Sequence, residues 1–207
     1  MYKGQEYSNF INLHKDKVFI VCGCGVSLIQ IIPYVDKFIT IGVNDISRAF
    51  KPNYLVLVNH KRTFINNERW QYIENYKGLI FTQYNNKELE LEESNLIKIN
   101  LKKLSKIDDF ENVGHSNNSP YVACHIAAQM GAKVIGLIGV DFTDNHFFEN
   151  TGTHILKNSL SKIINDYDFL INECKRMNIQ FYNLSKFSLI SSIEKIEIEH
   201  FVNLYDN

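Results

Sequence analysis

The sequence predicts a single α/β domain with a mostly parallel sheet and helices on both faces. Short, β-branched apolar runs alternate with segments of helical periodicity, as they do in strand–helix–strand units. The runs are continuously apolar, which is typical of strands buried on both faces. The chain has 207 residues, enough for one sizeable core, and contains neither an internal repeat nor a linker. We therefore treat residues 1–207 as one domain.

Seven apolar runs are predicted to be strands, and they cover residues 17–22, 37–42, 53–58, 78–83, 95–100, 133–140 and 179–185. Helical spacing of apolar residues predicts helices over 63–76 and 156–177. A third, alanine-rich helix is expected to have Ser119 as its N-cap and to end at Gly131. The C-terminal residues 188–207 form an amphipathic segment, which we expect to pack on the domain.

Composition excludes several classes of protein. The formal net charge is −1, so no strong field attracts the chain to nucleic acid. No apolar run approaches the roughly 20 residues of a transmembrane helix, and the first ten residues lack the apolar core of a secretory signal. We expect a cytoplasmic protein. The amphipathic C-terminus leaves association with a membrane surface open, and the aromatic residues near FFENTG leave a homo-oligomer open.

The four cysteines, Cys22, Cys24, Cys124 and Cys174, are interpreted as reduced packing residues, because none forms a C-x-x-C pair. His125 lies mid-helix beside alanines and is interpreted as a core histidine with its hydrogen bonds satisfied. Acids and histidines do occur between residues 141 and 154, but without a close-spaced pair of the H-x-x-x-H kind. We therefore predict no metal site.

Ligands of open parallel sheets bind beyond the carboxyl ends of the strands, where the strand order switches. Gly23 and Gly25 follow the first predicted strand, and glycines there let backbone N–H groups approach a phosphate or a ribose. The third glycine of the dinucleotide fingerprint would fall at Leu28, so the pattern is incomplete. A tight strand-to-helix turn explains the two glycines equally well.

Polar side chains follow the other predicted strands. Asn44 and Asp45 come after the second strand and Asn59 after the third. An amide offers both a donor and an acceptor, which suits a ribose hydroxyl or a base edge. The alternative is that Asn44 and Asp45 cap a short helix. Asp141 follows the strand over 133–140, where an acid can hold a ligand or bond the backbone of its own loop.

The start of the alanine-rich helix and the loop after Asp141 complete the candidate site. Unpaired N–H groups at the helix start favour an anion or a base near Asn117, Asn118 and Ser119. Residues 142–156 are predicted to form a short lid loop, in which a histidine could serve as general base or phosphate ligand. The candidate substrate-contacting residues are Asp45 and, within this loop, Thr143, His146 and Thr153, and His154 lies in the same loop.

Several segments resemble known families. These are VFIVCGCGVSL, IGVND, YLVLVN, NSPYVACHIAAQMGAKVIGLIGVDF and TGTH. They are similar to the bacterial sialyltransferases of glycosyltransferase family 42, and to the related MptE-like 6-hydroxymethylpterin diphosphokinases, which include motility accessory factor (Maf) proteins. The resemblance covers residues 17–184, and its most specific part is the helix–strand–Asp unit over 119–141, followed by a glycine and His154.

The sialyltransferase resemblance implies a Rossmann-like, nucleotide-binding domain that transfers a sugar from a CMP-linked donor to a hydroxyl of a cell-surface glycan. His154 matches the family's catalytic histidine and would deprotonate the acceptor hydroxyl. The resemblance implies no metal and no cofactor beyond the nucleotide sugar. The residues that it places around the nucleotide are Gly23, Gly25, Ser27, Asn44, Asn59, Ser119 and Asp141, and we add Asn118 from the helix start.

The chain departs from the sialyltransferase pattern in its lid, and these departures keep other functions open. Only twelve residues separate Asp141 from His154, phenylalanines replace the lid tyrosines, and Asn117 and Asn118 stand near the position of the family's arginine. One alternative is an MptE-like diphosphokinase that transfers pyrophosphate from ATP with Mg²⁺. Another is a non-catalytic module that binds a nucleotide sugar. A dinucleotide oxidoreductase is disfavoured by Leu28 and Asn44.

Overall fold

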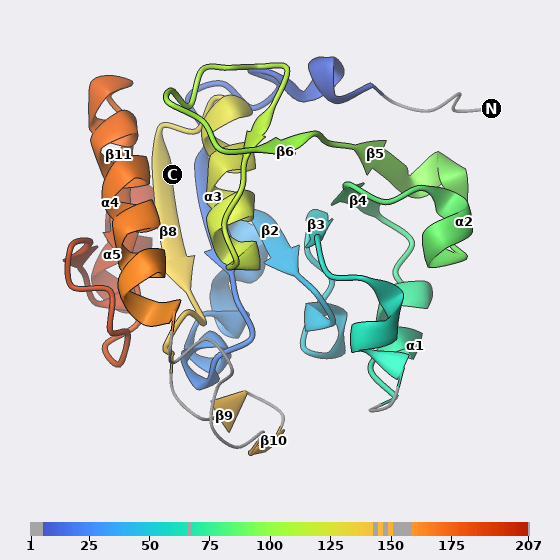
Figure 1. The fold of residues 1–207 in the computed structure, drawn as a ribbon. Helices are drawn as coiled ribbons and strands as arrows, with labels where there is room; N and C mark the ends of the chain where they lie inside the picture. Colours follow the sequence, from blue (N-terminus) through green and yellow to red (C-terminus); the bar gives the residue numbers. More distant parts are fainter. Residues whose placement is uncertain (1–5, 66–67, 143–144, 147–148, 151–158, 207) are drawn as a thin grey trace.

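A computed structural model describes residues 6–65, 68–142, 145–146, 149–150 and 159–206. In this part of the chain, eight strands form one sheet in the order β12-β11-β8-β1-β2-β3-β4-β5 (Figure 1). Every neighbouring pair is parallel, which confirms the predicted α/β class. The strands are β1 (Val18–Cys22), β2 (Ile39–Val43), β3 (Tyr54–Leu57), β4 (Leu79–Thr82), β5 (Leu96–Lys98), β8 (Val134–Ile138), β11 (Gln180–Asn183) and β12 (Glu194–Lys195).

Two small strand pairs lie outside the main sheet. The first pair is parallel and consists of β6 (Leu101–Lys102) and β7 (Val113–Gly114). The second pair is antiparallel, with β9 (Asn145–His146) and β10 (Glu149–Asn150), and belongs to the predicted lid loop.

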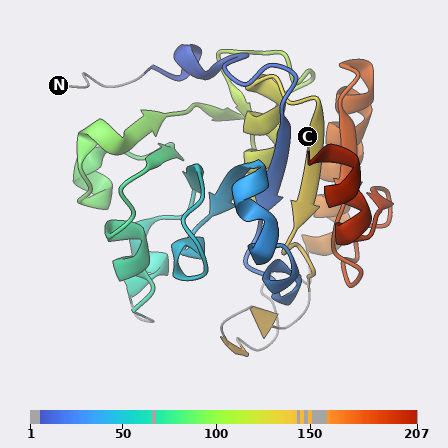
Figure 2. The same cartoon turned by 180° about the vertical axis from the view of Figure 1, so that it is seen from behind.

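Helices cover both faces of the sheet. On one face α3 (Ser119–Gln129) crosses the central strands, and α4 (Leu160–Arg176) lies beside it (Figure 1). On the other face lie α5 (Ile198–Tyr205) and the 3₁₀ helices η2 (Val26–Gln30) and η3 (Ile32–Lys37), as Figure 2 shows. The remaining helices are short: α1 (Trp70–Glu74), α2 (Asn86–Leu89), η1 (Tyr7–Phe10), η4 (Ile46–Arg48), η5 (Lys61–Thr63) and η7 (Glu93–Asn95).

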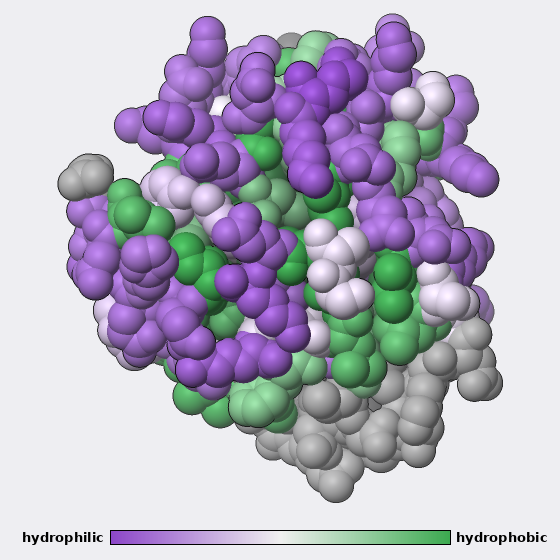
Figure 3. Space-filling model, turned by 90° about the vertical axis from the view of Figure 1, so that its left-hand side faces the viewer, coloured by the Kyte–Doolittle hydropathy of each residue, from purple (hydrophilic) through white to green (hydrophobic). Residues whose placement is uncertain are grey.

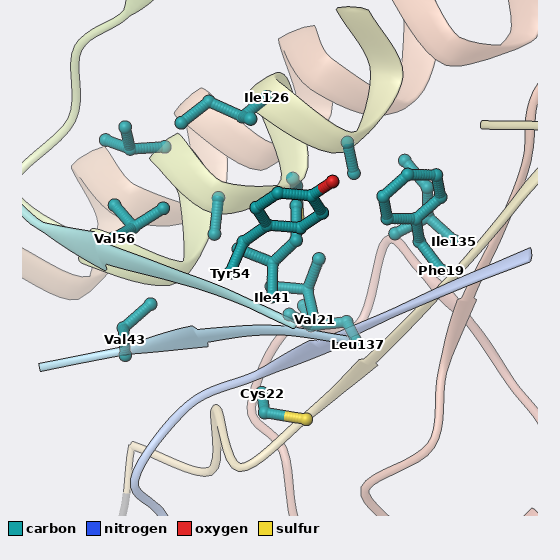
Figure 4. Packing of buried hydrophobic residues seen from close by; sticks show 14 of the residues in the cluster. Phe19, Val21, Cys22, Ile41, Val43, Tyr54, Val56, Ile126, Ile135 and Leu137 are labelled. Carbon is teal, nitrogen blue, oxygen red and sulfur yellow. The ribbon is translucent and has the colours of Figure 1, made fainter. Parts of the chain in front are cut away.

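The core lies between α3 and the central strands. Every residue of α3 is buried, which its alanines allow because small side chains let the helix approach the sheet closely. Phe19 and Val21 of β1 point toward α3, whereas Cys22 points to the opposite face (Figure 4). This alternation explains the continuous apolar run of β1, since both faces of the strand are covered.

The C-terminal segment packs on the domain as predicted. Ile198, Phe201 and Val202 of α5 are buried, and the Phe201 ring lies 5.7 Å from the ring of Phe38. The surface over α4 and α5 is a mixture of hydrophilic and hydrophobic residues (Figure 3). Among the described residues, no helix combines the length and apolar character needed to cross a membrane.

Two helix predictions need correction. The helix predicted over 63–76 shrinks to the five residues of α1, because Glu68 adopts a left-handed backbone conformation (φ 53°) that interrupts a right-handed helix. The N-cap of α3 is Asn118 and not Ser119. The Asn118 side-chain oxygen accepts the Tyr121 N–H at 3.2 Å, which makes Ser119 the first helical residue.

His125 is buried as predicted, but no described residue satisfies its hydrogen bonds. Neither ring nitrogen has a hydrogen-bond partner among the residues that the structure describes. Burial lowers the pKa of the imidazole to about 4, so the ring is neutral at physiological pH. The four cysteines are buried and unpaired, which agrees with their interpretation as packing residues.

Candidate functional site

The strand order places the candidate site at the carboxyl ends of the central strands. From β1 the chain proceeds to β2 and β3 on one side, whereas β8 and β11 extend the sheet on the other side. The switch in strand order therefore falls between β1 and β8, where open α/β sheets bind ligands. The loops that follow the parallel strands meet at this edge. The N-terminus of α3 lies at the same edge, because α3 precedes β8 in the chain and runs antiparallel to it.

Three predicted residues from three different elements come together there. Asn44 follows β2, Asn59 follows β3, and Ser119 begins α3. The Asn59 amide nitrogen donates to the Asn44 side-chain oxygen at 3.1 Å and lies 3.5 Å from the Ser119 hydroxyl oxygen. Asn44 has a φ of 56°, a left-handed conformation that asparagine tolerates better than most residues. Asn44 and Asn59 are half-buried, so their remaining amide groups can reach a ligand.

A second group joins the loops after β1, β8 and β11. Both oxygens of the buried Asp141 carboxylate accept hydrogen bonds from Ser27, one from its N–H at 2.9 Å and the other from its hydroxyl at 2.6 Å. The Ser185 hydroxyl donates to the same carboxylate at 2.5 Å. Asp141 therefore fastens three loops together at the switch point. Ser185 was not among the predicted site residues, although its place at the carboxyl end of the strand predicted over 179–185 was a usable signal.

The two glycines after β1 allow the loops after β1 and β8 to approach closely. A Cβ atom on Gly23 would lie 2.3 Å from the Gly139 carbonyl oxygen, and one on Gly25 would lie 2.5 Å from Asp141 Oδ2. The N–H groups of Gly23 and Gly25 donate to the carbonyls of Ile138 and Gly139, both at 2.8 Å. These two N–H groups are thus engaged within the protein, and the glycines shape the switch point by permitting close contact.

Asn118 immediately precedes α3 and contacts α4, the helix that follows the lid loop. Its side-chain oxygen accepts the Tyr167 hydroxyl at 2.8 Å in addition to the Tyr121 N–H. A second link runs from the Ser116 hydroxyl to the Asp166 carboxylate at 2.6 Å. The segment before α3 is thus tied to α4 at two successive residues of α4.

The Asp45 carboxylate is engaged within the protein and is not available to a ligand. It is fully buried and accepts two hydrogen bonds from Arg69, at 2.8 and 2.5 Å, while an Arg48 nitrogen lies 3.8 Å away. Asp45 does occupy the N-cap position of η4, as the alternative expected, but its side chain makes no capping hydrogen bond. The ion pair with Arg69 accounts for the burial of the charge.

The predicted lid residues are largely outside the described part of the chain. Thr143, Thr153 and His154 lie outside the described residues, and of His146 only the backbone, in β9, is described. The role of His154 as a general base therefore stays a prediction. The described residues contain no group of three or more His, Cys, Asp or Glu that could hold a metal ion.

Scans against models of known protein families and against curated proteins find no match. Among solved structures, the sialyltransferase CstII from Campylobacter jejuni has a similar fold. In complex with cytidine-5'-monophosphate it is 18% identical over 88% of this chain and 85% of that chain, with a TM-score of 0.50. In complex with CMP-3FNeuAc it is 17% identical over 92% and 88%, with a TM-score of 0.53.

A third similar structure is sialyltransferase CST-II in complex with a trisaccharide acceptor and CMP. It is 18% identical over 92% of this chain and 88% of that chain, with a TM-score of 0.53. These likenesses establish a shared α/β fold and confirm the sialyltransferase resemblance at the level of the fold. The resemblance to the pterin diphosphokinase group stays a prediction.

Proposed function

We propose that the protein is a glycosyltransferase that uses a nucleotide-linked sugar, with CMP as the nucleotide, and transfers the sugar to a hydroxyl of a cell-surface glycan. The observation that carries this proposal is the convergence of Asn44, Asn59 and Ser119 at the carboxyl edge of the sheet. The fold is shared with sialyltransferase structures solved with CMP, which supports the choice of nucleotide.

In this proposal the two groups of site residues have different tasks. Asn44, Asn59, Asn118 and Ser119 contact the nucleotide, because amides and hydroxyls suit ribose hydroxyls and base edges. The anionic phosphate lies near the positive end of the α3 dipole, where the Tyr121 N–H is already capped by Asn118 and Pro120 has no N–H, so the dipole and the Ser119 N–H and hydroxyl are what the helix start offers it. The loops that carry the remaining predicted nucleotide-binding residues shape the wall of this site, and those residues are Gly23, Gly25, Ser27 and Asp141.

The chemical step needs a base and no metal. The acceptor hydroxyl oxygen attacks the anomeric carbon, the bond from that carbon to the phosphate oxygen breaks, and CMP leaves with the electron pair. His154 takes the proton of the hydroxyl as the new glycosidic bond forms. The side chains that would contact the sugar and the acceptor are expected in the lid loop, with Thr143, His146 and Thr153 as candidates. The reaction is expected in the cytoplasm. The nucleotide sugar is the donor substrate, and no separate cofactor is expected.

Release of CMP from a panel of CMP-linked sugars tests this proposal directly. We expect the wild type to turn over when divalent metal ions are removed by a chelator. Turnover should fall by about 100-fold in His154→Ala, because general-base catalysis contributes on that order. The matched control is His200→Ala, at an exposed position of α5. Absence of CMP release with every donor would contradict the transferase proposal. Mg²⁺-dependent formation of AMP from ATP would favour the diphosphokinase instead.

A further inference from the structure

The amide of Asn118 is held in one orientation by two donors. The Tyr121 backbone N–H can only donate, so the Asn118 atom that faces it at 3.2 Å must be the oxygen. The Tyr167 hydroxyl lies 2.8 Å from the same oxygen and therefore donates to it as well. Both lone pairs of the oxygen are then used, and a flipped amide would turn its NH₂ group toward a fixed donor.

In this orientation the amide nitrogen of Asn118 remains as a hydrogen-bond donor that needs an acceptor. Asn118 is 7% exposed as a residue, and its amide nitrogen donates to no residue in the part of the chain that the structure describes. This nitrogen is not among the fully buried atoms without a partner, so it remains accessible to a ligand. An NH₂ group offers two donors and no acceptor, so its partner must be an acceptor oxygen or ring nitrogen. The residue next to it, Ser119, already belongs to the candidate nucleotide site.

Tyr167 is well suited to hold this amide. It is fully buried, and its ring packs edge-on against Tyr121 with centroids 5.7 Å apart. Burial raises the pKa of its phenol well above the usual value, so the hydroxyl keeps its proton and remains a donor. A buried hydroxyl with a single direction to donate fixes its acceptor more firmly than a mobile surface group would.

We propose that Tyr167 is a positioning residue that orients the Asn118 amide so that its NH₂ group donates to an acceptor atom of the bound nucleotide. The proposal rests on the proposed nucleotide site and adds to it a residue of α4, the helix that follows the lid loop. Tyr167 itself does not contact the nucleotide. Its contribution should appear in nucleotide affinity and should depend on the presence of the Asn118 amide.

A double-mutant cycle measured by titration calorimetry with CMP tests this dependence. Tyr167→Phe removes only the hydroxyl, and we expect CMP affinity to fall about 5- to 10-fold, the effect of one hydrogen bond. Asn118→Asp keeps an acceptor for both donors but loses the NH₂ group, so it should weaken binding at least as much. In the Asn118→Asp background, adding Tyr167→Phe should then cost no further affinity.

The matched control is Tyr76→Phe. The Tyr76 hydroxyl is also buried and donates to the Pro52 carbonyl at 3.0 Å, so its loss reproduces the structural cost of removing a buried phenol. We expect this variant to bind CMP as the wild type does. Unchanged affinity in Tyr167→Phe, or an equal loss in both backgrounds, would overturn the inference alone. A wild-type protein that binds none of CMP, CDP and ATP would overturn it together with the proposed function.

Discussion

Buried polar side chains fall into two kinds in this protein. Asp45 and Asp141 are buried acids whose oxygens all meet donors from other segments, Arg69 in one case and Ser27 and Ser185 in the other. His125 is the opposite case, since neither ring nitrogen has a partner among the described residues. Buried polar groups without hydrogen bonds destabilise the folded state, so His125 is a weak point in the core.

Replacing His125 with an apolar side chain should stabilise the protein. We expect His125→Leu to raise the free energy of unfolding by about 1–2 kcal/mol, because the cost of burying two unpaired nitrogens disappears. The ring is closely surrounded, since a Cβ on Gly114 would lie 2.6 Å from its Cδ2, so leucine is chosen as an apolar residue of similar size. Urea unfolding at pH 7.5 measures the change. Equal or lower stability would show that the imidazole is satisfied, for example by internal water.

The same residue should give the protein a pH-dependent stability. The folded pKa of His125 is lowered to about 4, below the unfolded value of 6.5, so the unfolded state binds more protons between these pH values. Stability should fall as the pH drops from 6.5 to 4, by roughly 3 kcal/mol at most from this group. The difference between wild type and His125→Leu in urea unfolding isolates it from other titrating groups. A difference that does not vary with pH would contradict the assignment.

At the scale of elements, the strands could be predicted and the irregular helices could not. Each strand of the main sheet before β12 coincides with a predicted apolar run, since burial on both faces leaves a continuous apolar signature. The predicted N-cap of α3 was one residue too late. Asn118 and Ser119 are both good caps, and only the folded backbone selects one. Glu68 gave no signal of its left-handed conformation, which ended the predicted helix over 63–76.

The contact between the loops after β1 and β8 should tolerate no side chain at Gly25. Its φ of −71° suits any residue, so the obstacle is steric, from Asp141 Oδ2 at 2.5 Å and the Gly139 oxygen at 2.8 Å. We expect Gly25→Ala to lower the free energy of unfolding by about 1–3 kcal/mol, the usual cost of overpacking. Thermal unfolding monitored by circular dichroism measures it. Wild-type stability would mean that the two loops are not held as closely as described.

At the scale of the whole molecule, parallel topology explains why a site could be predicted at all. Residues that follow parallel strands arrive at one edge of the sheet, so Asn44 and Asn59 could be assigned to a shared site from sequence. The hydrogen-bond partners of Asn118 and Asp141 were not predictable in the same way. Tyr167 lay in the helix predicted over 156–177 without an assigned role, and Ser185 lay at the end of a predicted strand, but contacts across tens of residues leave no local pattern that would pair either with its partner.

The central claim is that these strand ends form a binding site for CMP. Titration calorimetry of the full chain with CMP in the absence of metal tests it most directly, with Asn59→Ala as the site variant and the exposed Asn203→Ala as its control. We predict one CMP per chain and about tenfold weaker binding in Asn59→Ala alone, since one amide's hydrogen bonds are lost. No binding of CMP, together with tight Mg²⁺-dependent binding of ATP, would contradict the claim.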